Sequence, residues 1–309
     1  MSSITYRLWK KLHKKNTASP FFVKLFDRLS ERLLKRGEID AYYPLLSDKP
    51  YKIAESFAVN SYKKYFALQL FENVMETLVV GSSHGFCGYW AEERLHEINA
   101  CEPSQDLYYS YEIYKKYADA PRLKNVVLFY SVFSPGSVLE LTSQADGCDC
   151  YRYFYGIPYR FGGNTEKRGA REAFSLFVER MKKKPDFHYV ENVTKPPVFD
   201  TDPRERAASH LKNNKRDENQ TVYVAKAAAL AKEKGHRLYV VVPPARSDYT
   251  ACLPPFEEIF AELLKLKDGV RILSFFGDSR FSDSDFCDTD HLTADGAKKL
   301  SALIREQTG

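Results

Sequence analysis

The sequence predicts an α/β fold in which a mainly parallel sheet is covered by helices on both faces. Apolar runs of strand length alternate along the chain with segments of helix length, as they do in βαβ units. The first of these runs, just before Gly81, is of the short apolar kind that is typical of a strand buried on both faces. Hydrophobic residues make up 44% of the 309 residues, enough for a large core, so a globally disordered chain is excluded.

The first predicted strand ends in a sharp turn that carries a serine. A helix over residues 62–76 leads into the apolar run 77–80, and Gly81 then allows the backbone to turn. Ser83 lies on this turn, at the carboxyl end of the strand, where open α/β sheets bind their ligands. One interpretation is a nucleophilic serine. The other is a tight connection whose serines simply cap the next helix.

The remaining elements follow the same rhythm to the end of the chain. Strands are predicted over 96–100, 125–133, 237–242 and 270–275. Helices are predicted over 89–95, 105–117, 166–184, 219–234, 255–266 and 294–306. The alternation predicts that the strands run parallel, so that their carboxyl ends meet at one edge of the sheet.

Two regions interrupt this rhythm and define the predicted domains. Residues 1–60 form basic helices and an irregular lead-in, and residues 61–309 form the α/β domain with an insertion at about 145–205. The insertion carries an aromatic run, 151–159, and we expect it to form a lid or one wall of a cleft. Aromatic rings of this kind can stack against sugar rings or fill a core, and both remain open.

The positive charge of the chain is concentrated at its start. Residues 1–36 contain ten Lys and Arg against two acidic residues. The segments 4–12 and 21–34 both have apolar residues at helical spacing with basic residues between them. Such helices can lie on an anionic membrane surface or pack against the domain, and the broad apolar face of the second favours packing.

The composition also indicates the cellular compartment of the protein. The six cysteines have no C-x-x-C spacing, which fits a reducing compartment and argues against a zinc cage or a disulfide framework. The sequence has no recognisable secretory signal and no apolar segment of membrane-spanning length. We therefore expect a cytoplasmic location, at most peripheral at the inner face of the membrane. Neither a bound cofactor nor a nucleic-acid partner is expected.

A second polar motif stands just before the last predicted helix. Asp288 and His291 are three residues apart on a loop that enters this helix. A carboxylate at this spacing can hydrogen-bond one imidazole nitrogen and leave the other as a base. If Ser83 ends the first strand and His291 follows the last, both lie on the same rim of a parallel sheet. The base could then take the serine proton and return it to a leaving group.

Together these motifs resemble the SGNH/GDSL superfamily of serine hydrolases and acyltransferases. The resemblance rests on Gly81-Ser82-Ser83-His84 and on Asp288-Thr289-Asp290-His291-Leu292, and it covers roughly residues 74–306. It implies a three-layer α/β/α domain with a flavodoxin-like sheet. It also implies Ser83 as nucleophile, His291 as base and Asp288 as the group that orients the base.

The sequence departs from this superfamily where the oxyanion hole is expected. Ser82 replaces the usual acidic residue, and the expected Gly and Asn after the second and third strands are not in register. The Ser83 backbone N–H can still serve as a donor. Further candidates for the oxyanion hole are Asn99, Ser131 and Ser134, and candidates for substrate contacts are His84, His210 and Arg246. Ordinary structural or solvated roles are the alternative for each of these six residues.

Two competing patterns involve other residues of the last loops. Asp283, Asp285, Asp288 and Asp290 could hold a divalent cation, as in a metal-dependent glycosyltransferase, but this leaves His291 unexplained. A literal Gly277-Asp278-Ser279 follows the last strand instead of the first, which disfavours Ser279 as nucleophile.

The leading functional prediction is acyl transfer to a carbohydrate through an acyl-Ser83 intermediate. The acceptor would be a surface polysaccharide built at the cytoplasmic membrane face, and acetyl-CoA or another acyl donor would be a co-substrate. One alternative is hydrolysis of carbohydrate or lipid esters by the same three residues. The others are a non-catalytic binding module of the same fold and the metal-dependent glycosyltransferase.

Overall fold

The computed structural model describes residues 29, 55–142, 144–161, 202–214 and 219–308. The chain forms two compact units, one of residues 1–62 and 143–188 and the other of residues 63–142 and 189–309. The first unit therefore combines the N-terminal segment with much of the predicted insertion. The predicted boundary near residue 60 and the extent of the insertion stay predictions.

The larger unit is built on a parallel sheet, which confirms the predicted fold class. In its described part the sheet has five strands in the order β2-β1-β3-β4-β5, with every neighbouring pair parallel. The order is that of flavodoxin-like folds. The strands are β1 (Thr77–Val80), β2 (Glu97–Asn99), β3 (Asn125–Phe129), β4 (Arg237–Val242) and β5 (Arg271–Ser274).

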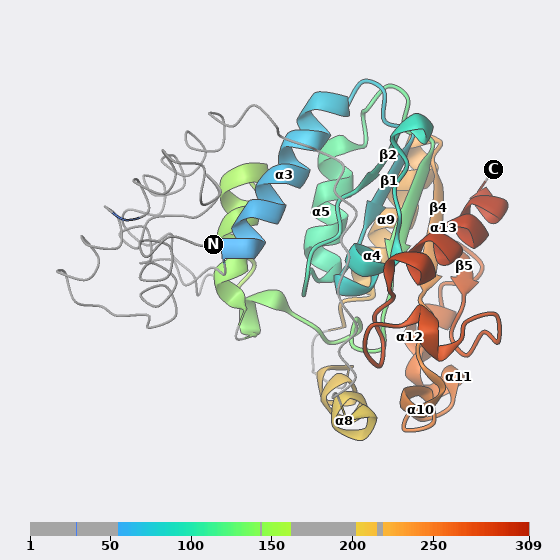
Figure 1. Cartoon of the computed structure of the whole chain (residues 1–309). Helices are drawn as coiled ribbons and strands as arrows, with labels where there is room; N and C mark the ends of the chain where they lie inside the picture. The colour runs from blue at the N-terminus through green and yellow to red at the C-terminus, as the bar shows by residue number, and fades with distance from the viewer. Residues whose placement is uncertain (1–28, 30–54, 143, 162–201, 215–218, 309) are drawn as a thin grey trace. The chain divides into compact units, whose positions relative to one another are not determined.

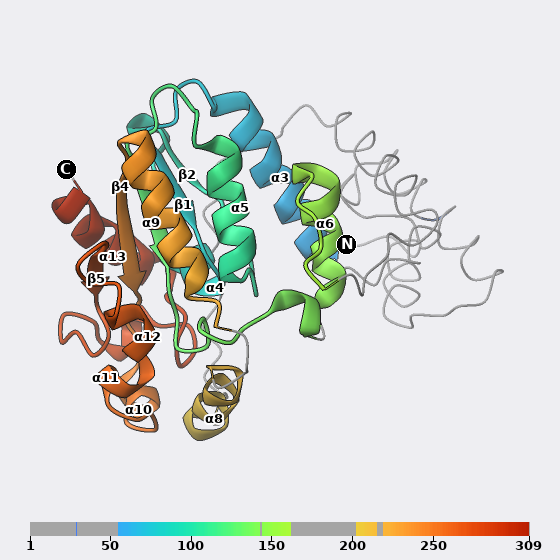
Figure 2. The same ribbon diagram turned by 180° about the vertical axis from the view of Figure 1, so that it is seen from behind.

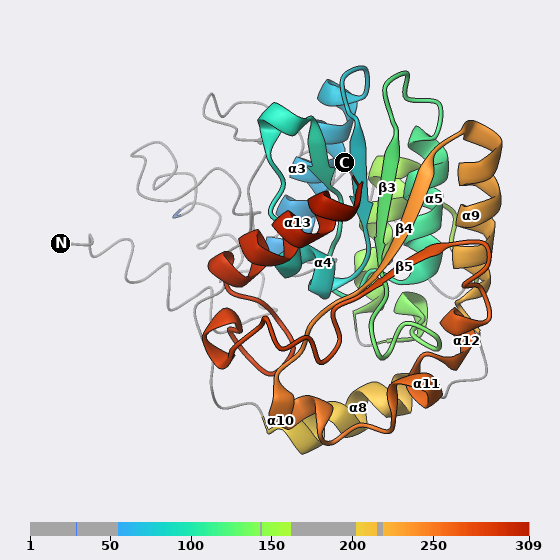
Figure 3. The same ribbon diagram turned by 90° about the vertical axis from the view of Figure 1, so that its right-hand side faces the viewer.

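Helices cover both faces of this sheet, so the unit has three layers. On one face α5 (Leu107–Tyr117) lies beside α9 (Val222–Lys234), and on the other α4 (Ser83–Gly88) lies beside α13 (Ala294–Thr308). Figure 1 shows α5 and α9 behind the sheet, Figure 2 shows them in front of it, and Figure 3 shows α13 and α4 across the opposite face. All four residues of β1 are buried, as expected for a strand covered on both sides.

The connection from β1 to α4 is tight because two glycines let backbone and side chains approach. Gly81 has a φ of +145°, and a Cβ there would lie 2.7 Å from the Cβ of Phe129. A Cβ on Gly85 would lie 2.8 Å from the Phe129 ring. Phe129 and the apolar side of α4 join Leu300 and Ile304 of α13 in one core cluster. The turn that carries Ser83 is thus anchored on the core of the domain.

Several predicted elements differ from those observed. The helix predicted over 89–95 is wrong: α4 already begins at Ser83, since Gly85 serves close packing and does not interrupt the helix. Strand β3 ends at Phe129 because residues 131–134 close a turn, with Ser134 N–H donating to the carbonyl oxygen of Ser131. The helix predicted over 255–266 is divided at Phe260 into α11 (Phe256–Ile259) and α12 (Ala261–Leu264).

Two further helices stand near the carboxyl ends of the strands, and the sequence analysis predicted neither. They are α8 (Pro203–Asn214) and the short α10 (Ser247–Thr250), which contact each other. In α8 only Ala207 and His210 are buried, so the sequence has little apolar periodicity to indicate a helix. Helix α3 (Glu55–Phe71) begins within the segment predicted to be an irregular lead-in and ends before the predicted helix 62–76 does.

The described part of the smaller unit contains α6 (Cys148–Cys150) and a π-helix at Tyr151–Tyr155. In this aromatic run Tyr151, Phe154 and Tyr155 are buried, and Phe154 packs against Tyr62. The predicted N-terminal helices and the predicted helix 166–184 lie outside the described residues. Among the residues that are described, no helix is both long and apolar enough to cross a membrane.

Candidate active site

The candidate site lies at the carboxyl ends of β1 and β3, where the strand order reverses. From β1 the chain first continues to β2 on one side and then returns to β3 on the other. Open α/β sheets bind ligands in the crevice that such a reversal creates. Ser83 follows β1 and Ser131 follows β3, so both serines stand at this position. Ser83 is half-buried, whereas Ser131 is buried.

The loop before α13 brings a histidine to the same place. Phe286 and Leu292 form an antiparallel bridge, and Cys287 N–H donates to the carbonyl oxygen of His291 at 2.9 Å. Asp288 accepts hydrogen bonds from the backbone N–H groups of Asp290 and His291, at 3.0 and 2.7 Å. The loop is therefore closed by its own backbone, and Asp288 is fixed within it.

Ser83, His291 and Asp288 form a continuous chain of hydrogen bonds. The Ser83 hydroxyl lies 2.9 Å from His291 Nε2, and His291 Nδ1 lies 2.8 Å from an Asp288 oxygen. Because a carboxylate only accepts, Nδ1 carries the proton, and Nε2 of the neutral ring accepts from the serine. The structure thus brings together the three residues that the sequence analysis selected from opposite ends of the chain.

The charge of Asp288 is maintained by its partner. Burial alone would raise the pKa of this carboxyl group, but the hydrogen bond and charge of His291 outweigh burial and lower that pKa below its usual value. Asp288 is therefore ionised at neutral pH and can stabilise a positive charge on the imidazole.

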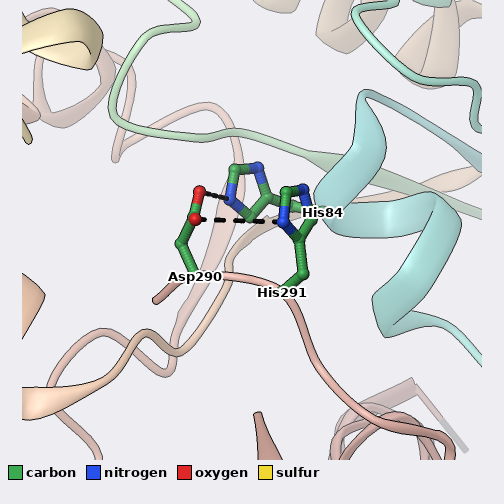
Figure 4. Close-up of side chains that lie close together, drawn as sticks. All are labelled: His84, Asp290 and His291. Atoms are coloured by element: carbon green, nitrogen blue, oxygen red, sulfur yellow. Dashed lines mark hydrogen bonds and ion pairs between the residues drawn. The ribbon is translucent and has the colours of Figure 1, made fainter. Parts of the chain in front are cut away.

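A second chain of the same residue types lies directly beside the first. His84 Nε2 lies 2.8 Å from an Asp290 oxygen, and His84 Nδ1 lies 2.7 Å from the Ser131 hydroxyl. The His84 and His291 rings are stacked, with centroids 4.9 Å apart and planes 14° apart. Figure 4 shows the two imidazoles face to face and Asp290 reaching both. Asp290 Oδ1 lies 3.8 Å from His291 Nδ1.

Asp290 is a buried carboxylate with several donors around it. Arg206 of α8 binds it through two nitrogens, with Nε and Nη2 each 3.0 Å from a carboxylate oxygen, and Thr289 donates its hydroxyl at 3.0 Å. Burial would raise the pKa of Asp290, but the His84 hydrogen bond and the surrounding positive groups hold it well below the usual value. The loop that carries His291 is thereby tied to α8.

Two of the buried histidines of this region, His84 and His210, are neutral. Burial lowers the pKa of His84, against the opposing influence of Asp290. Burial also lowers the pKa of His210 to about 3, and its Nδ1 lies 2.6 Å from the Tyr249 hydroxyl. A small cavity of about 10 Å³, room for roughly one water molecule, is lined by His84, Ser131, Tyr249, Asp290 and apolar residues of the β4 end.

The other sequence-predicted candidates have structural partners. Asn99 donates its amide hydrogens to the carbonyl oxygens of Gly85 and Tyr89, both at 2.9 Å, so they are not directed at a substrate. Ser134 Oγ accepts from the Ser131 N–H at 2.8 Å. Arg246 pairs with Asp248, and its backbone N–H donates to the carbonyl oxygen of Thr289. Ser279 is exposed on the loop after β5.

Potential metal ligands in this region already serve other groups. His84, Asp290 and His291 each have one ligand atom within 4.8 Å of the others. Asp290, however, is paired with a guanidinium, whose positive charge opposes a cation at the same oxygens. Of the four loop aspartates, Asp285 pairs with Lys299 and Asp288 bonds His291, so they do not form a common set of ligands.

Sequence analysis missed Arg206 and Tyr249, and it considered Asp290 only as a metal ligand. The pattern Asp288-Thr289-Asp290-His291 contains a signal, because two carboxylates alternate beside one histidine. Which carboxylate bonds His291 and which bonds His84 depends on how the loop closes, so residue spacing alone could not assign these two pairs.

Comparisons with known proteins give a distant similarity. No protein-family model matches this chain, and no curated protein does. Among solved structures, a protein from Desulfitobacterium hafniense DCB-2, described as a lipolytic protein of the G-D-S-L family, is similar at a TM-score of 0.35 and 11% sequence identity. The similarity covers 75% of this chain and 98% of that one. A similarity at this TM-score carries no argument about this chain, and the function of the site has to be inferred from its own geometry.

Proposed function

We propose that the protein is a serine-dependent acyl-transfer enzyme of the esterase or acyltransferase kind. The observation that carries this proposal is the chain Ser83–His291–Asp288, with hydrogen bonds of 2.9 and 2.8 Å, at the reversal point of the sheet. A hydroxyl, a base and an orienting carboxylate in this order form the arrangement that activates a serine for attack on a carbonyl.

The geometry gives each group a step. The Ser83 oxygen attacks the carbonyl carbon of an ester while its proton passes to His291 Nε2. Asp288 stabilises the imidazolium, which then returns the proton to the leaving oxygen as the carbonyl–oxygen bond breaks. In the second half of the reaction, water or an acceptor hydroxyl attacks the carbonyl carbon of the acyl-serine and gives its proton to His291 Nε2, which passes a proton to the Ser83 oxygen as the acyl–serine bond breaks. The product is an acid or a new ester.

We place the oxyanion at the start of α4. Ser83 is the first residue of this helix, and Ser82 before it makes no capping hydrogen bond through its side chain to the described residues. Backbone N–H groups of a first helical turn have no partner within the helix, so the Ser83 N–H remains to bind a developing negative charge. Asn99 is a weaker candidate because its amide hydrogens hold the α4 region.

The finer assignment, transfer of an acetyl group to a polysaccharide, rests on the sequence. It draws on the aromatic run 151–159 and the basic residues 1–36, and it names acetyl-CoA or another acyl donor and an anionic membrane surface as partners. Hydrolysis of carbohydrate or lipid esters uses the same three residues and is the alternative. We favour catalysis over a non-catalytic binding module because the serine, base and carboxylate are hydrogen-bonded in order.

A fluorophosphonate probe tests the proposal without knowledge of the substrate. The folded wild type should be labelled on Ser83, and the peptide should be identified by mass spectrometry. Absence of labelling in folded protein would favour the non-catalytic module. Release of CoA from acetyl-CoA in the presence of glycans, compared with release in water alone, would separate transfer from hydrolysis.

A further inference from the structure

We propose that His84 and Asp290 are positioning residues for His291: the His84 ring holds the plane of the His291 ring, and Asp290 adds a second carboxylate beside it. The inference rests on the proposed function and deepens it, because it assigns the second Ser–His–Asp chain a role in the chemistry of the first. Arg206 completes the arrangement by fixing Asp290 from α8.

The stacking restrains the tilt of the His291 ring, which the hydrogen bond to Asp288 leaves free. Asp288 sets the position of His291 Nδ1, but the ring can still tilt about that contact. A buried parallel ring at 4.9 Å blocks the tilt on one face. His84 itself is fixed at both ring nitrogens, by Asp290 and by Ser131. The stack is therefore rigid, and His291 Nε2 stays directed at the Ser83 hydroxyl.

The charges around the stack favour one protonation pattern. His291 gains a proton during the reaction, and a second imidazolium stacked on it would repel that charge. Burial lowers the pKa of His84, so the ring stays neutral when His291 is charged. Asp290 Oδ1 lies 3.8 Å from His291 Nδ1 and adds an attraction to that of Asp288. The charged and titratable groups facing His84 are Asp290, His291, His210 and Arg206.

The second chain is better suited to this role than to nucleophilic attack. Ser131 is 1% exposed, and its hydroxyl donates to His84 within a cavity that holds about one water molecule. An ester carbonyl cannot approach it there. Its geometry resembles that of the first chain, but its surroundings keep substrate out.

The test uses the full-length chain and the rate of fluorophosphonate labelling of Ser83 as a function of pH. Asp290→Asn keeps the shape of the side chain and removes its charge. We expect labelling to slow by about tenfold to a hundredfold, since small misplacements of a catalytic group have effects of this size. The acidic limb of the pH profile should also move to lower pH, because a proton on the base loses a neighbouring negative charge. A purely structural defect would lower the rate equally at every pH.

Two variants at His84 separate the ring from its hydrogen bonds. His84→Phe keeps a flat ring, and we expect it to label within about fivefold of wild type; His84→Ala removes the ring and should label about tenfold to a hundredfold more slowly. Proton NMR gives a readout that needs no activity. The ring-current shift of the His291 protons should persist in His84→Phe and vanish in His84→Ala.

The matched control is Asp278→Asn, which disrupts another bidentate Asp–Arg pair on the surface, with Arg280. It should leave the labelling rate and the pH profile unchanged. Equal rates for His84→Phe and His84→Ala would overturn the positioning role of the ring, and an unmoved acidic limb in Asp290→Asn would overturn the role of the charge. Absence of labelling in folded wild type would instead overturn the proposed function. In that case the ring-current shifts would still show whether the His84 ring stacks on the His291 ring.

Discussion

The two Ser–His–Asp chains of this molecule have almost the same hydrogen-bond lengths and different surroundings. In the first, which we call the open chain, Ser83, His291 and Asp288 are joined at 2.9 and 2.8 Å, and the serine is half-buried. In the second, the buried chain, Ser131 and Asp290 lie 2.7 and 2.8 Å from the two nitrogens of His84, and all three side chains are buried.

The difference shows that hydrogen-bond geometry alone does not identify a nucleophile. The ring is also reversed: His291 presents Nε2 to its serine, whereas His84 presents Nδ1 to Ser131. The carboxylate of the buried chain is held by Arg206, but that of the open chain has no such guanidinium among the described residues. Under the proposed function, solvent access and charge make the first chain the reactive one and the second chain its support.

Replacing the accessible serine should have the largest effect. Ser83→Ala removes the atom that attacks, so esterase activity on p-nitrophenyl acetate should fall by at least about 10⁴-fold. Fluorophosphonate labelling should disappear with it. Ser279→Ala, in the exposed Gly277-Asp278-Ser279 sequence, is the matched control and should keep wild-type activity. Labelling that persists in Ser83→Ala, on any other serine, would contradict the division between the two chains.

Replacing Asp288, the carboxylate of the open chain, should have the second-largest effect on activity. Asp288→Asn keeps the loop but presents an amide to His291 Nδ1, which allows the wrong tautomer of the ring. We expect kcat to fall by about 10⁴-fold while the protein stays folded by circular dichroism. A loss of less than about threefold would mean that His291 does not depend on Asp288 for its orientation.

The open chain could be predicted from sequence because topology does most of the positioning. Parallel strands place their carboxyl ends at one edge, so a serine after the first strand and a histidine before the last helix were expected on the same edge of the sheet. The element order was predictable for the same reason. The predicted strand 237–242, apolar after its first residue, coincides with β4 at both ends.

The buried chain could not be predicted, because it depends on side-chain packing between segments with weak patterns. Arg206 lies on α8, a helix with few buried residues, and nothing in its sequence indicates that it reaches Asp290. The neutral state of His84 follows from burial among Phe133, His210 and His291, which spacing does not reveal. The early start of α4 was missed because its glycines suggested an open turn.

The buried histidines should make stability sensitive to mild acid. His210 has a folded pKa of about 3 against an ordinary value near 6.5, so below pH 6.5 the unfolded chain takes up a proton that the folded chain does not. Stability is therefore lost as the pH falls from 6.5 towards 3, by about 2 kcal/mol between pH 7 and pH 5 for this residue.

His210→Gln should remove this contribution to the change in the free energy of unfolding with pH. Urea unfolding of both proteins at pH 7 and pH 5 measures that change. Groups near His210 are Asp290, Arg206, His84, His291 and Tyr249. The pKa of Asp290 is lowered, so its contribution is lost only at more acidic pH, below about 4, and does not enter the comparison. An identical slope in wild type and His210→Gln would show that His210 titrates normally in the folded protein.

The buried serine should give the smallest effect, although its hydrogen bond is the shorter of the two. Ser131→Ala leaves His84 Nδ1 without its donor, which should cost about 1–3 kcal/mol of stability. Asp290 still binds the other ring nitrogen, and the stack on His291 remains. Labelling of Ser83 should therefore slow by less than about tenfold, against complete loss in Ser83→Ala. If Ser131→Ala abolished labelling in a folded protein, the buried chain would have to take part in the reaction directly, and solvent access would not be what distinguishes the two.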